Sequence, residues 1–540
     1  MSKESERLLE SLSHLPDRPL DEAVDFRRPR RRPRAGVLAA AACLVLVIGA
    51  GIAALPWLVG GRSAAPGGGA GTGSGTAGHD ESTVFLHYAG PVLPLTAAED
   101  TAVTAQRTVT LDFAPWEPVW VSNEDMAGGD AAYLEQLNEW NPEGGRYVTS
   151  DDILVTDEYV LTNPTAADET LTVYYPFAGS LNMAGRYVPT VTAGGTALET
   201  ELLAGGYSGG FAPAYGAEAG DEALLNLSPA GWEDYRALLA SDGYLAGALA
   251  GDVDLSGIPA VVYAFTDYWG PEEGDDAPSP TIRASYEMDY EQTVVLSHGF
   301  NGGSYDPGAG VQARSFSIPQ PGERGYGRTF YLIVLGDDIA NLELTCYSTG
   351  GWDTEAEAEG GAAVTRTETN LAAALEPVID TLYGDIGWEA GAPMEGNEEL
   401  YAAAFRRQLA AYVLAEDAPA RYGEGMLENL DVVNVSRILY LAAEVTVPAG
   451  GQLTVTAELR KEASYDFDCA HTENRGVRGY DLLTEGNHLT ITSQTAALED
   501  WGQISIVRQN FGFDLAAGVR TVTLDPAQPH YYLEVRRVDP

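Results

Sequence analysis

The longest uncharged run in the sequence sets the first constraint on how this chain can fold. From Ala35 to Gly61 there are 27 consecutive residues without a charged side chain, and nearly all of them are small or apolar. At about 1.5 Å per residue, a helix of this length spans the roughly 30 Å hydrocarbon core of a bilayer. The run therefore predicts a single transmembrane helix over residues 35–61.

Arginines on one side of this run predict its orientation. Basic residues flanking a membrane helix stay in the cytoplasm, and only Arg62 follows the run closely. The arginines that precede the run and determine the predicted topology are Arg27, Arg28, Arg30, Arg31, Arg32 and Arg34. We therefore expect the N-terminus in the cytoplasm and the chain after Gly61 outside it.

A cleaved signal peptide and a buried core helix are the alternatives to an anchor. The apolar part of a signal peptide has about 7 to 15 residues, fewer than this run has, although Ser63-Ala64-Ala65 offers a cleavage site. We expect an uncleaved anchor. Residues 62–81 are rich in Gly, Ala and Ser, which predicts a flexible linker.

Residues 1–34 form a predicted cytoplasmic head with one apolar stripe. Leu8, Leu9, Leu12 and Leu15 fall on one face of a short helix. An isolated helix of about 12 residues is marginal in water, so it would need an apolar surface to lie against. Nearby glutamates disfavour anionic lipid and favour a protein partner, and an unstructured leader is the alternative.

The charge balance excludes one class of partner. The 540 residues include 79 acidic and 31 basic side chains, which gives a formal net charge of −48. Phosphate backbones are bound through Lys and Arg, so this balance excludes a general nucleic-acid binder. With 45% of the residues apolar, the chain can still bury packed cores.

Short β-rich runs dominate residues 82–363 and predict the fold class, which is mainly β with antiparallel β-sandwich-type domains. Turn residues such as Asn163-Pro164-Thr165 and Gly194-Gly195 separate these runs. The clearest strand patterns are TVTLDF (108–113), ILVTDEYVLT (153–162), TLTVYY (170–175), 281–297 and TFYLIVL (329–335).

Helical spacing interrupts the β pattern. A short helix is predicted after Ser228-Pro229, and residues 364–434 carry apolar residues three and four apart, which predicts a helical insert. Strand patterns return over residues 435–540, beginning with a hairpin around PAGGQ. We therefore expect this C-terminal region to be β-rich.

Two fragments resemble the α/β-hydrolase family. Gly206-Tyr207-Ser208-Gly209-Gly210 matches the G-x-S-x-G pattern, and TVVLSHGFNGG, with His298-Gly299, resembles the oxyanion loop of lipases. In that family the oxyanion loop precedes the nucleophile, whereas here it follows by about ninety residues. Pro213 and several glycines also replace the helix expected after the serine. We therefore predict no catalytic residue here.

No pattern predicts a metal or another cofactor. Asp252, Asp254 and Ser256 begin like an EF-hand loop, but Tyr263 occupies the twelfth position, where a bidentate glutamate is needed. We interpret this segment as a turn before a strand. The acidic runs 272–276 and 353–359 are interpreted as solvated loops, with weak Ca²⁺ binding as the alternative.

Aromatic and sulfur side chains complete the candidate set. Trp116, Trp120 and Trp140 could stack on sugars beside paired carboxylates, but we expect them to be core residues. Cys346 and Cys469 follow the predicted membrane helix and are candidates for a disulfide; buried free thiols are the alternative.

The N-terminal segments resemble Gram-positive single-pass membrane proteins described as anti-sigma-like. The resemblance lies in a leucine-rich turn, an acidic stretch, a basic run and an "LAAC" anchor, here Leu8 to Leu15, Asp21-Glu22-Ala23, Arg27 to Arg34 and Leu38 to Cys43. It covers about 60 of the 540 residues. It implies a cytosolic partner such as a sigma factor.

Two outer segments, EYVLTNPTAADETLTVYYPF (158–177) and NFGFDLAAGVRTVTLDPAQPHYYLEVRR (510–537), resemble uncharacterised extracytoplasmic β-domains of the same kind of protein. That likeness implies no activity. The expected protein is therefore a membrane-anchored, non-enzymatic binding or sensor protein with an unknown extracellular ligand. A cell-surface hydrolase is the alternative.

Overall fold

The computed structural model covers most of the chain after the predicted linker. It describes residues 87, 89–128, 131–183, 185–207, 243–249, 251–323, 325–352, 354–389, 391–414, 426–430, 432–434, 437–465, 475–485 and 488–538. The predicted head with its leucine stripe, the arginine run, the predicted membrane helix, the linker, Ser208, the helix predicted after Ser228-Pro229, and Cys469 lie outside these ranges.

Within the described ranges, no helix combines the length and the apolar character needed to cross a bilayer.

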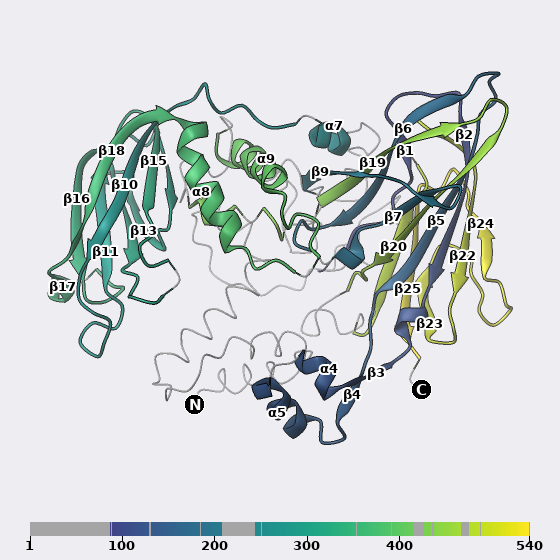
Figure 1. The fold of residues 1–540 in the computed structure, drawn as a ribbon, viewed down its shortest axis with the longest axis horizontal. Coiled ribbons are helices and arrows are strands. Elements are labelled where there is room, and N and C mark those ends of the chain that lie inside the picture. The colour runs from purple at the N-terminus through teal and green to yellow at the C-terminus, as the bar shows by residue number, and fades with distance from the viewer. Residues whose placement is uncertain are drawn as a thin grey trace. The chain divides into compact units, whose positions relative to one another are not determined.

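The protein is mainly β and has several sheets, as the sequence predicts. The chain divides into two compact units (Figure 1). The first unit contains residues 1–249, 390–393 and 435–540, and the second contains residues 250–389 and 394–434. Each unit builds its own sheets from strands of the described ranges.

The described residues before 208 contribute nine strands to the first unit. They are β1 (Thr96–Ala97), β2 (Thr104–Asp112), β3 (Val119–Ser122), β4 (Gly145–Val148), β5 (Ile153–Thr162), β6 (Glu169–Gly179), β7 (Thr190–Ala193), β8 (Thr196–Ala197) and β9 (Glu201–Tyr207). The C-terminal region adds β19 (Arg437–Val447), β20 (Gln452–Lys461), β21 (Arg478–Leu483), β22 (Thr490–Glu499), β23 (Ile504–Gln509), β24 (Thr521–Thr523) and β25 (His530–Arg537).

The helical elements that the structure describes in this unit are short. They are the 3₁₀ turns η1 (Ala114–Trp116) and η2 (Gly185–Tyr187) and the α-helices α4 (Asn123–Ala127), α5 (Ala131–Trp140) and α7 (Gly243–Leu249). The helices α4 and α5 were not predicted. Ser122 is the N-cap of α4 and accepts a hydrogen bond from the Asp125 N–H, so Ser122-x-x-Asp125 was a local start signal.

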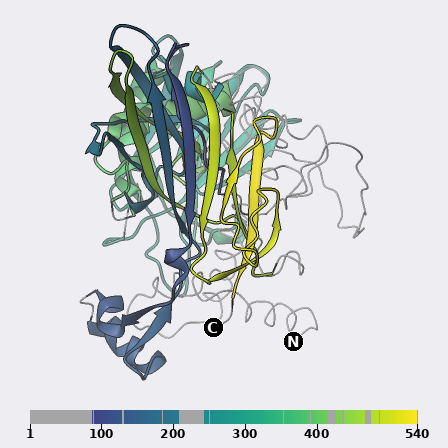
Figure 2. The same cartoon turned by 90° about the vertical axis from the view of Figure 1, so that its right-hand side faces the viewer.

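Strands from both ends of the sequence share the sheets of the first unit. The largest sheet has the order β24-β22-β2-β5-β20-β7-β8, the second β1-β6-β19-β9 and the third β21-β25-β23, while β3 and β4 form a separate ribbon. Figure 2 shows the long strands side by side. Among the described strands, the ladders are antiparallel except that β2 and β22 run parallel, and Val92 and Leu482 form an isolated parallel bridge. The prediction of antiparallel sheets is therefore wrong for β2 and β22.

Turns in the first unit carry the chain from one sheet to another. Asn163 leads from β5 to β6, and its Nδ2 donates to the carbonyls of Ala167 (2.8 Å) and Val447 (3.1 Å). The turn between β19 and β20 contains Gly450 at φ +61°, a conformation that favours glycine. Asn163 therefore connects the predicted turn after β5 to the end of β19, where the predicted turn before β20 begins.

The described residues of the second unit form nine strands and two longer helices. The strands are β10 (Pro259–Trp269), β11 (Thr281–Glu287), β12 (Thr293–His298), β13 (Gly302–Asp306), β14 (Val311–Ser317), β15 (Phe330–Gly336), β16 (Ala340–Tyr347), β17 (Glu357–Ala358) and β18 (Gly361–Asn370). The helical elements are η5 (Thr354–Ala356), α8 (Leu371–Asp385), α9 (Glu398–Leu409), the π-turn η6 (Ala410–Leu414) and η7 (Leu427–Asn429).

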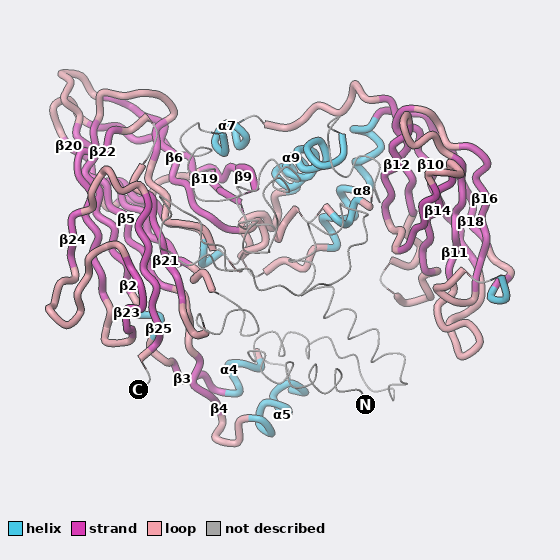
Figure 3. The backbone as a smooth tube through the Cα atoms, turned by 180° about the vertical axis from the view of Figure 1, so that it is seen from behind, coloured by secondary structure: helices cyan, strands magenta, loops and turns pink. Residues whose placement is uncertain are grey.

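Two antiparallel sheets supply the core of the second unit. Their orders are β12-β15-β10-β18 and β13-β14-β11-β16-β17. Phe265 and Leu332 from the first sheet and Ile282 and Phe316 from the second are completely buried in one apolar cluster. Figure 3 shows α8, in cyan, beside these strands, with α9 next to α8.

The unit boundaries can be set beside the predicted regions. Residues 82–363, predicted as a β-rich region, contribute strands to both units, which divide near residue 250, and residues 435–540 join the first unit. The predicted helical insert, 364–434, begins with the end of β18, and α8 starts at Leu371 because Asn370 caps it. Strand pairing over such distances leaves no local signal in the sequence.

Candidate functional site

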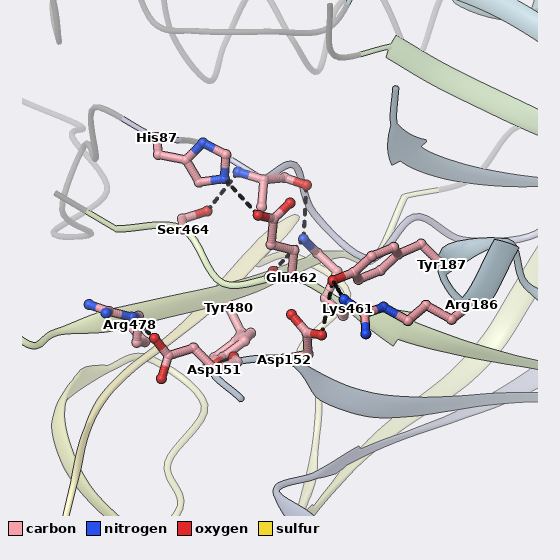
Figure 4. Close-up of polar contacts among 11 residues, drawn as sticks. His87, Asp151, Asp152, Arg186, Tyr187, Lys461, Glu462, Ser464, Arg478 and Tyr480 are labelled. Carbon is pink, nitrogen blue, oxygen red and sulfur yellow. Dashed lines mark hydrogen bonds and ion pairs between the residues drawn. The ribbon is translucent and has the colours of Figure 1, made fainter. Parts of the chain in front are cut away.

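A buried lysine marks the most unusual polar cluster in the first unit. Figure 4 shows Lys461, the last residue of β20, with side chains from the two residues before β5, from η2 and from β21. Its Nζ donates to the carbonyl of Ala89 at 2.8 Å and to that of Glu462 at 2.9 Å. Burial lowers the pKa of Lys461, while the carboxylates of Asp481, Glu462 and Asp152 oppose that shift.

Two aspartates before β5 hold the other side chains of this cluster. Asp152 is buried and accepts hydrogen bonds from Arg460 Nε (2.8 Å) and the Tyr187 hydroxyl (3.1 Å). Burial raises the pKa of Tyr187, and Asp152 raises it further. Asp151 accepts from Arg478 Nε at 2.6 Å. Each aspartate thus ties β5 to another element.

The N-terminal segment joins the cluster through residues that follow β20. His87 Nε2 lies 3.3 Å from Glu462 Oε1, and the Ala89 N–H donates to Ser464 Oγ at 3.0 Å. His87 and Tyr465 also form an antiparallel bridge. Together with Lys461, these contacts connect His87 and Ala89 to residues more than 370 positions later in the chain.

The chemistry open to Lys461 follows from its contacts and burial. A lysine with a lowered pKa is a common nucleophile in enzymes. Here the side chain is 5% exposed, and two carbonyl oxygens accept from its ammonium. A substrate would have to displace both carbonyls to reach the nitrogen. The geometry therefore favours a clamp between chain segments over covalent catalysis.

A second buried charge cluster lies across β2, β5 and β6. Arg107 and Asp157 form a bidentate pair, with both N–O distances 2.8 Å and both side chains fully buried. Arg107 Nη1 donates to the Leu483 carbonyl at 2.6 Å. The hydroxyls of Tyr159 and Tyr175 donate to Asp157 at 2.8 Å and 3.3 Å.

The pKa shifts in this second cluster keep its charges in place. Burial alone would lower the pKa of Arg107, but Asp157 raises it above the usual value. Burial also raises the pKa values of Tyr159 and Tyr175, so both hydroxyls stay protonated and act as donors. The cluster is internally satisfied, as a buried ion pair must be.

The neighbouring strands β21 and β25 contain a buried histidine. His530 Nε2 lies 3.2 Å from Asp481 Oδ2, and both residues are buried. Burial lowers the pKa of His530 to about 3, so the ring is neutral at pH 7. Asp481 also lies near Lys461, where its charge partly offsets the lowering of the lysine pKa by burial.

The segment that resembles a lipase oxyanion loop has another role in the second unit. His298 ends β12, which pairs antiparallel with β15. Glu428 Oε1 lies 2.8 Å from His298 Nδ1 and accepts the Gly299 N–H at 2.5 Å. An oxyanion hole needs its backbone N–H groups free for substrate. This N–H is instead donated to a carboxylate.

The remaining predicted residues fall in ordinary structural positions. Cys346 is a buried free thiol in the core of the second unit, and burial raises its pKa. A Cβ built on Gly360 would lie 2.4 Å from Cys346 Sγ, so only glycine fits beside it. The partner proposed for it, Cys469, lies outside the described residues.

The EF-hand-like segment is a turn, as expected. Asp254 Oδ1 accepts the Ser256 N–H at 2.8 Å, and hydrogen bonding with the Ser256 side chain and then with its backbone lowers the pKa of Asp254. Asp252 Oδ1 accepts from Arg406 Nε at 2.7 Å. In the described ranges, no group of three or more His, Cys, Asp or Glu side chains is placed to hold a metal ion.

The expectation that the three tryptophans are core residues holds for Trp116 and fails for the other two. Trp116 is buried beside Phe113 and Tyr480. Trp120 and Trp140 are exposed, because the chain leaves the sheets between β2 and β5 to form the β3–β4 ribbon and two helices. Alternating apolar residues could not distinguish such a ribbon from a core strand.

No protein-family model, curated protein or solved structure matches this chain.

Proposed function

We propose that this chain is a single-pass membrane-anchored protein whose β-rich part lies outside the cytoplasm and binds a ligand or acts as a sensor without catalysing a reaction. The observation that carries the proposal is the uncharged run from Ala35 to Gly61 directly after six arginines. Length and charge asymmetry of this kind are the two features that define an anchor and its orientation.

The architecture of the described residues supports an extracytoplasmic binding role. We infer that the second unit is an antiparallel β-sandwich, since one apolar cluster draws on both of its sheets. Sandwiches of this kind serve as rigid supports for binding loops in many surface proteins. The strongly negative charge keeps such a surface soluble and repels anionic lipid.

The polar clusters support a non-enzymatic role. Lys461, Arg107 and His530 are all buried and use their polar atoms to hold strands together. A catalytic constellation would need such groups in contact with a substrate. The proposal therefore assigns these residues to the stability of the fold.

A protease-protection experiment on intact cells tests the topology. Added protease is expected to remove a tag fused after Pro540 and to spare a tag fused before Met1. A variant with Arg27, Arg28, Arg30, Arg31, Arg32 and Arg34 all replaced by Glu is the matched control, because it removes the charge asymmetry and keeps the apolar run. Protection of both tags in the wild type would refute the proposal.

Signalling through the head is the further part of the proposal. The leucine stripe supports a helix that becomes stable on a partner's apolar groove, and a sigma factor is the partner that the resemblance implies. A sigma factor is expected to co-purify with the full chain and to be lost in the Leu8→Asp, Leu12→Asp variant. Equal recovery of the sigma factor with the wild type and the double variant would refute signalling through the leucine stripe. The protein would then be a tethered surface domain only.

The hydrolase alternative has a direct chemical test. Fluorophosphonate labelling of the purified full chain is expected to be no stronger than labelling of its Ser208→Ala variant. Labelling that depends on Ser208 would replace the binding proposal with a surface hydrolase.

A further inference from the structure

An exposed aromatic ribbon extends from the first unit between η1 and β5. It consists of β3 and β4 with the helices α4 and α5, and both Figure 1 and Figure 2 show it beyond the ends of β2 and β5. Trp120 is 44% exposed and Tyr147 is 68% exposed. Val119, Val148 and Trp140 are exposed as well. The proposed function does not assign a role to this surface.

The strand register places these side chains on both faces of the ribbon. Trp120 is paired with Tyr147, and their rings meet edge to face with centroids 5.2 Å apart. Val119 is paired with Val148, so the two valines occupy the opposite face. A two-stranded ribbon is marginal in water by itself, and clustered exposed apolar residues mark interaction surfaces.

The surroundings of Trp120 hold its ring in place. A Cβ built on Gly145 would lie 2.8 Å from the indole, so the ring rests closely on the backbone of that glycine. Asn123 Nδ2 donates to Asn138 Oδ1 at 2.8 Å and to the Asn141 carbonyl at 3.0 Å, which joins α4 to α5. The ribbon thus presents a preorganised aromatic surface, which lowers the entropic cost of binding.

Charge identifies the kind of partner that this surface fits. The acidic side chains of the ribbon and its helices are exposed in every described case, and residues 117–150 contain a single basic residue, Arg146. The exposed acids are Glu117, Glu124, Asp125, Glu135, Glu139 and Glu143. Anionic lipid would be repelled, and so would a second copy of a chain with net charge −48.

We propose that the β3–β4 ribbon is a docking surface for an arginine-rich segment of a partner protein. A guanidinium group is planar, stacks on the faces of Trp and Tyr, and pairs with surrounding carboxylates. Trp120 and Tyr147 supply the aromatic faces, and the acids around them supply the opposite charge. Arginine fits this combination better than lysine, because the more strongly hydrated ammonium stacks less readily.

Binding of hexaarginine to the full chain in a non-ionic detergent tests this proposal. Titration calorimetry is expected to show tighter binding of hexaarginine than of hexalysine. The Trp120→Ala, Tyr147→Ala variant should lose roughly tenfold in affinity, as expected for two aromatic anchors. Trp269→Ala is the matched control, because Trp269 is exposed on β10 of the second unit, and it should bind like the wild type.

A second variant keeps the test valid if the ribbon unfolds without its aromatic pair. Glu124→Gln, Glu139→Gln and Glu143→Gln together retain the rings and should weaken hexaarginine binding and its salt dependence. Equal affinity of the wild type and both variants would overturn the proposal. Trp120-dependent binding of phosphatidylglycerol vesicles, or Trp120-dependent self-association in sedimentation, would overturn it in favour of a membrane or a second copy. None of these outcomes alters the topology test above.

Discussion

At the scale of single residues, buried charges of the first unit are bound to partners that lie far away in the sequence. Arg107 contacts Asp157 and also reaches Leu483 and Gln494, which belong to the C-terminal half of the chain. Such a pair contributes little net stability, but loss of one partner leaves a buried charge without compensation. The expected effect of a substitution therefore depends on whether one or both partners are replaced.

Arg107→Met should destabilise the first unit by about 3–5 kcal/mol, because Asp157 would remain buried without its guanidinium. The double variant Arg107→Met, Asp157→Leu should recover most of this loss, since apolar side chains of similar size replace the pair. Urea unfolding of the full chain followed by circular dichroism measures both. A double variant no more stable than the single one would contradict this account.

The buried histidine predicts how the first unit responds to acid. The pKa of His530 is lowered to about 3 in the folded protein, against about 6.5 when unfolded, so the unfolded chain binds more protons between these values. This contribution to stability is present above pH 6.5 and is lost as the pH falls toward 3. Between these pH values, the contribution of His530 to the free energy of unfolding should change by up to about 1.4 kcal/mol per pH unit.

Urea midpoints measured from pH 7 to pH 4 test this dependence. The His530→Asn variant cannot take up the proton, so its midpoint should fall less steeply across the same range. Parallel slopes for the wild type and His530→Asn would show that another group is responsible.

At the scale of elements, side-chain caps determine where the helices of the second unit begin. Asn370 Oδ1 accepts the Ala373 N–H at 3.0 Å at the start of α8, and Asn397 Oδ1 accepts the Leu400 N–H at 3.1 Å at the start of α9. A cap satisfies one of the backbone donors that the first turn leaves without a partner. The strand β18 consequently passes directly into α8.

Asn370→Ala should destabilise the second unit by about 1 kcal/mol, the usual cost of a lost N-cap. Asn370→Asp is the matched control, because its carboxylate can accept the same hydrogen bond and favours a helix N-terminus. Thermal unfolding of the full chain, followed by the circular dichroism of its helices, compares the Asn370→Ala and Asn370→Asp variants. Equal destabilisation by Ala and Asp would show that the cap hydrogen bond is not the cause.

At the scale of the whole molecule, the two units keep separate sheets and separate cores among the described strands. Phe316, completely buried in the second unit, and Arg107 in the first therefore report on different cooperative structures. Calorimetry of the full chain should show two thermal transitions. Phe316→Ala should destabilise only the second unit, by about 3–5 kcal/mol, and so lower the temperature of one transition. Arg107→Met should lower the temperature of only the other transition. A single transition shifted by both variants would contradict two independent units.

The sequence by itself determined the mainly β character and several of the strands. β5 occupies the predicted residues 153–162, and its burial alternates along the strand, because a period of two is a local property of apolar residues on a half-buried strand. The turns at Asn163 and Gly450 were equally readable from residues that favour reversals. The sequence likewise contains the uncharged run and the arginines on which the proposed topology depends.

Only the tertiary structure decided which strands share a sheet and which polar groups meet. The parallel pairing of β2 with β22 and the contact of Lys461 with Ala89 join residues more than 370 positions apart, and nothing local encodes such a contact. The same holds for Trp120, whose exposure depends on where the chain leaves the sheet. Patterns along a sequence report neighbouring residues, whereas burial and pairing depend on the whole chain being folded at once.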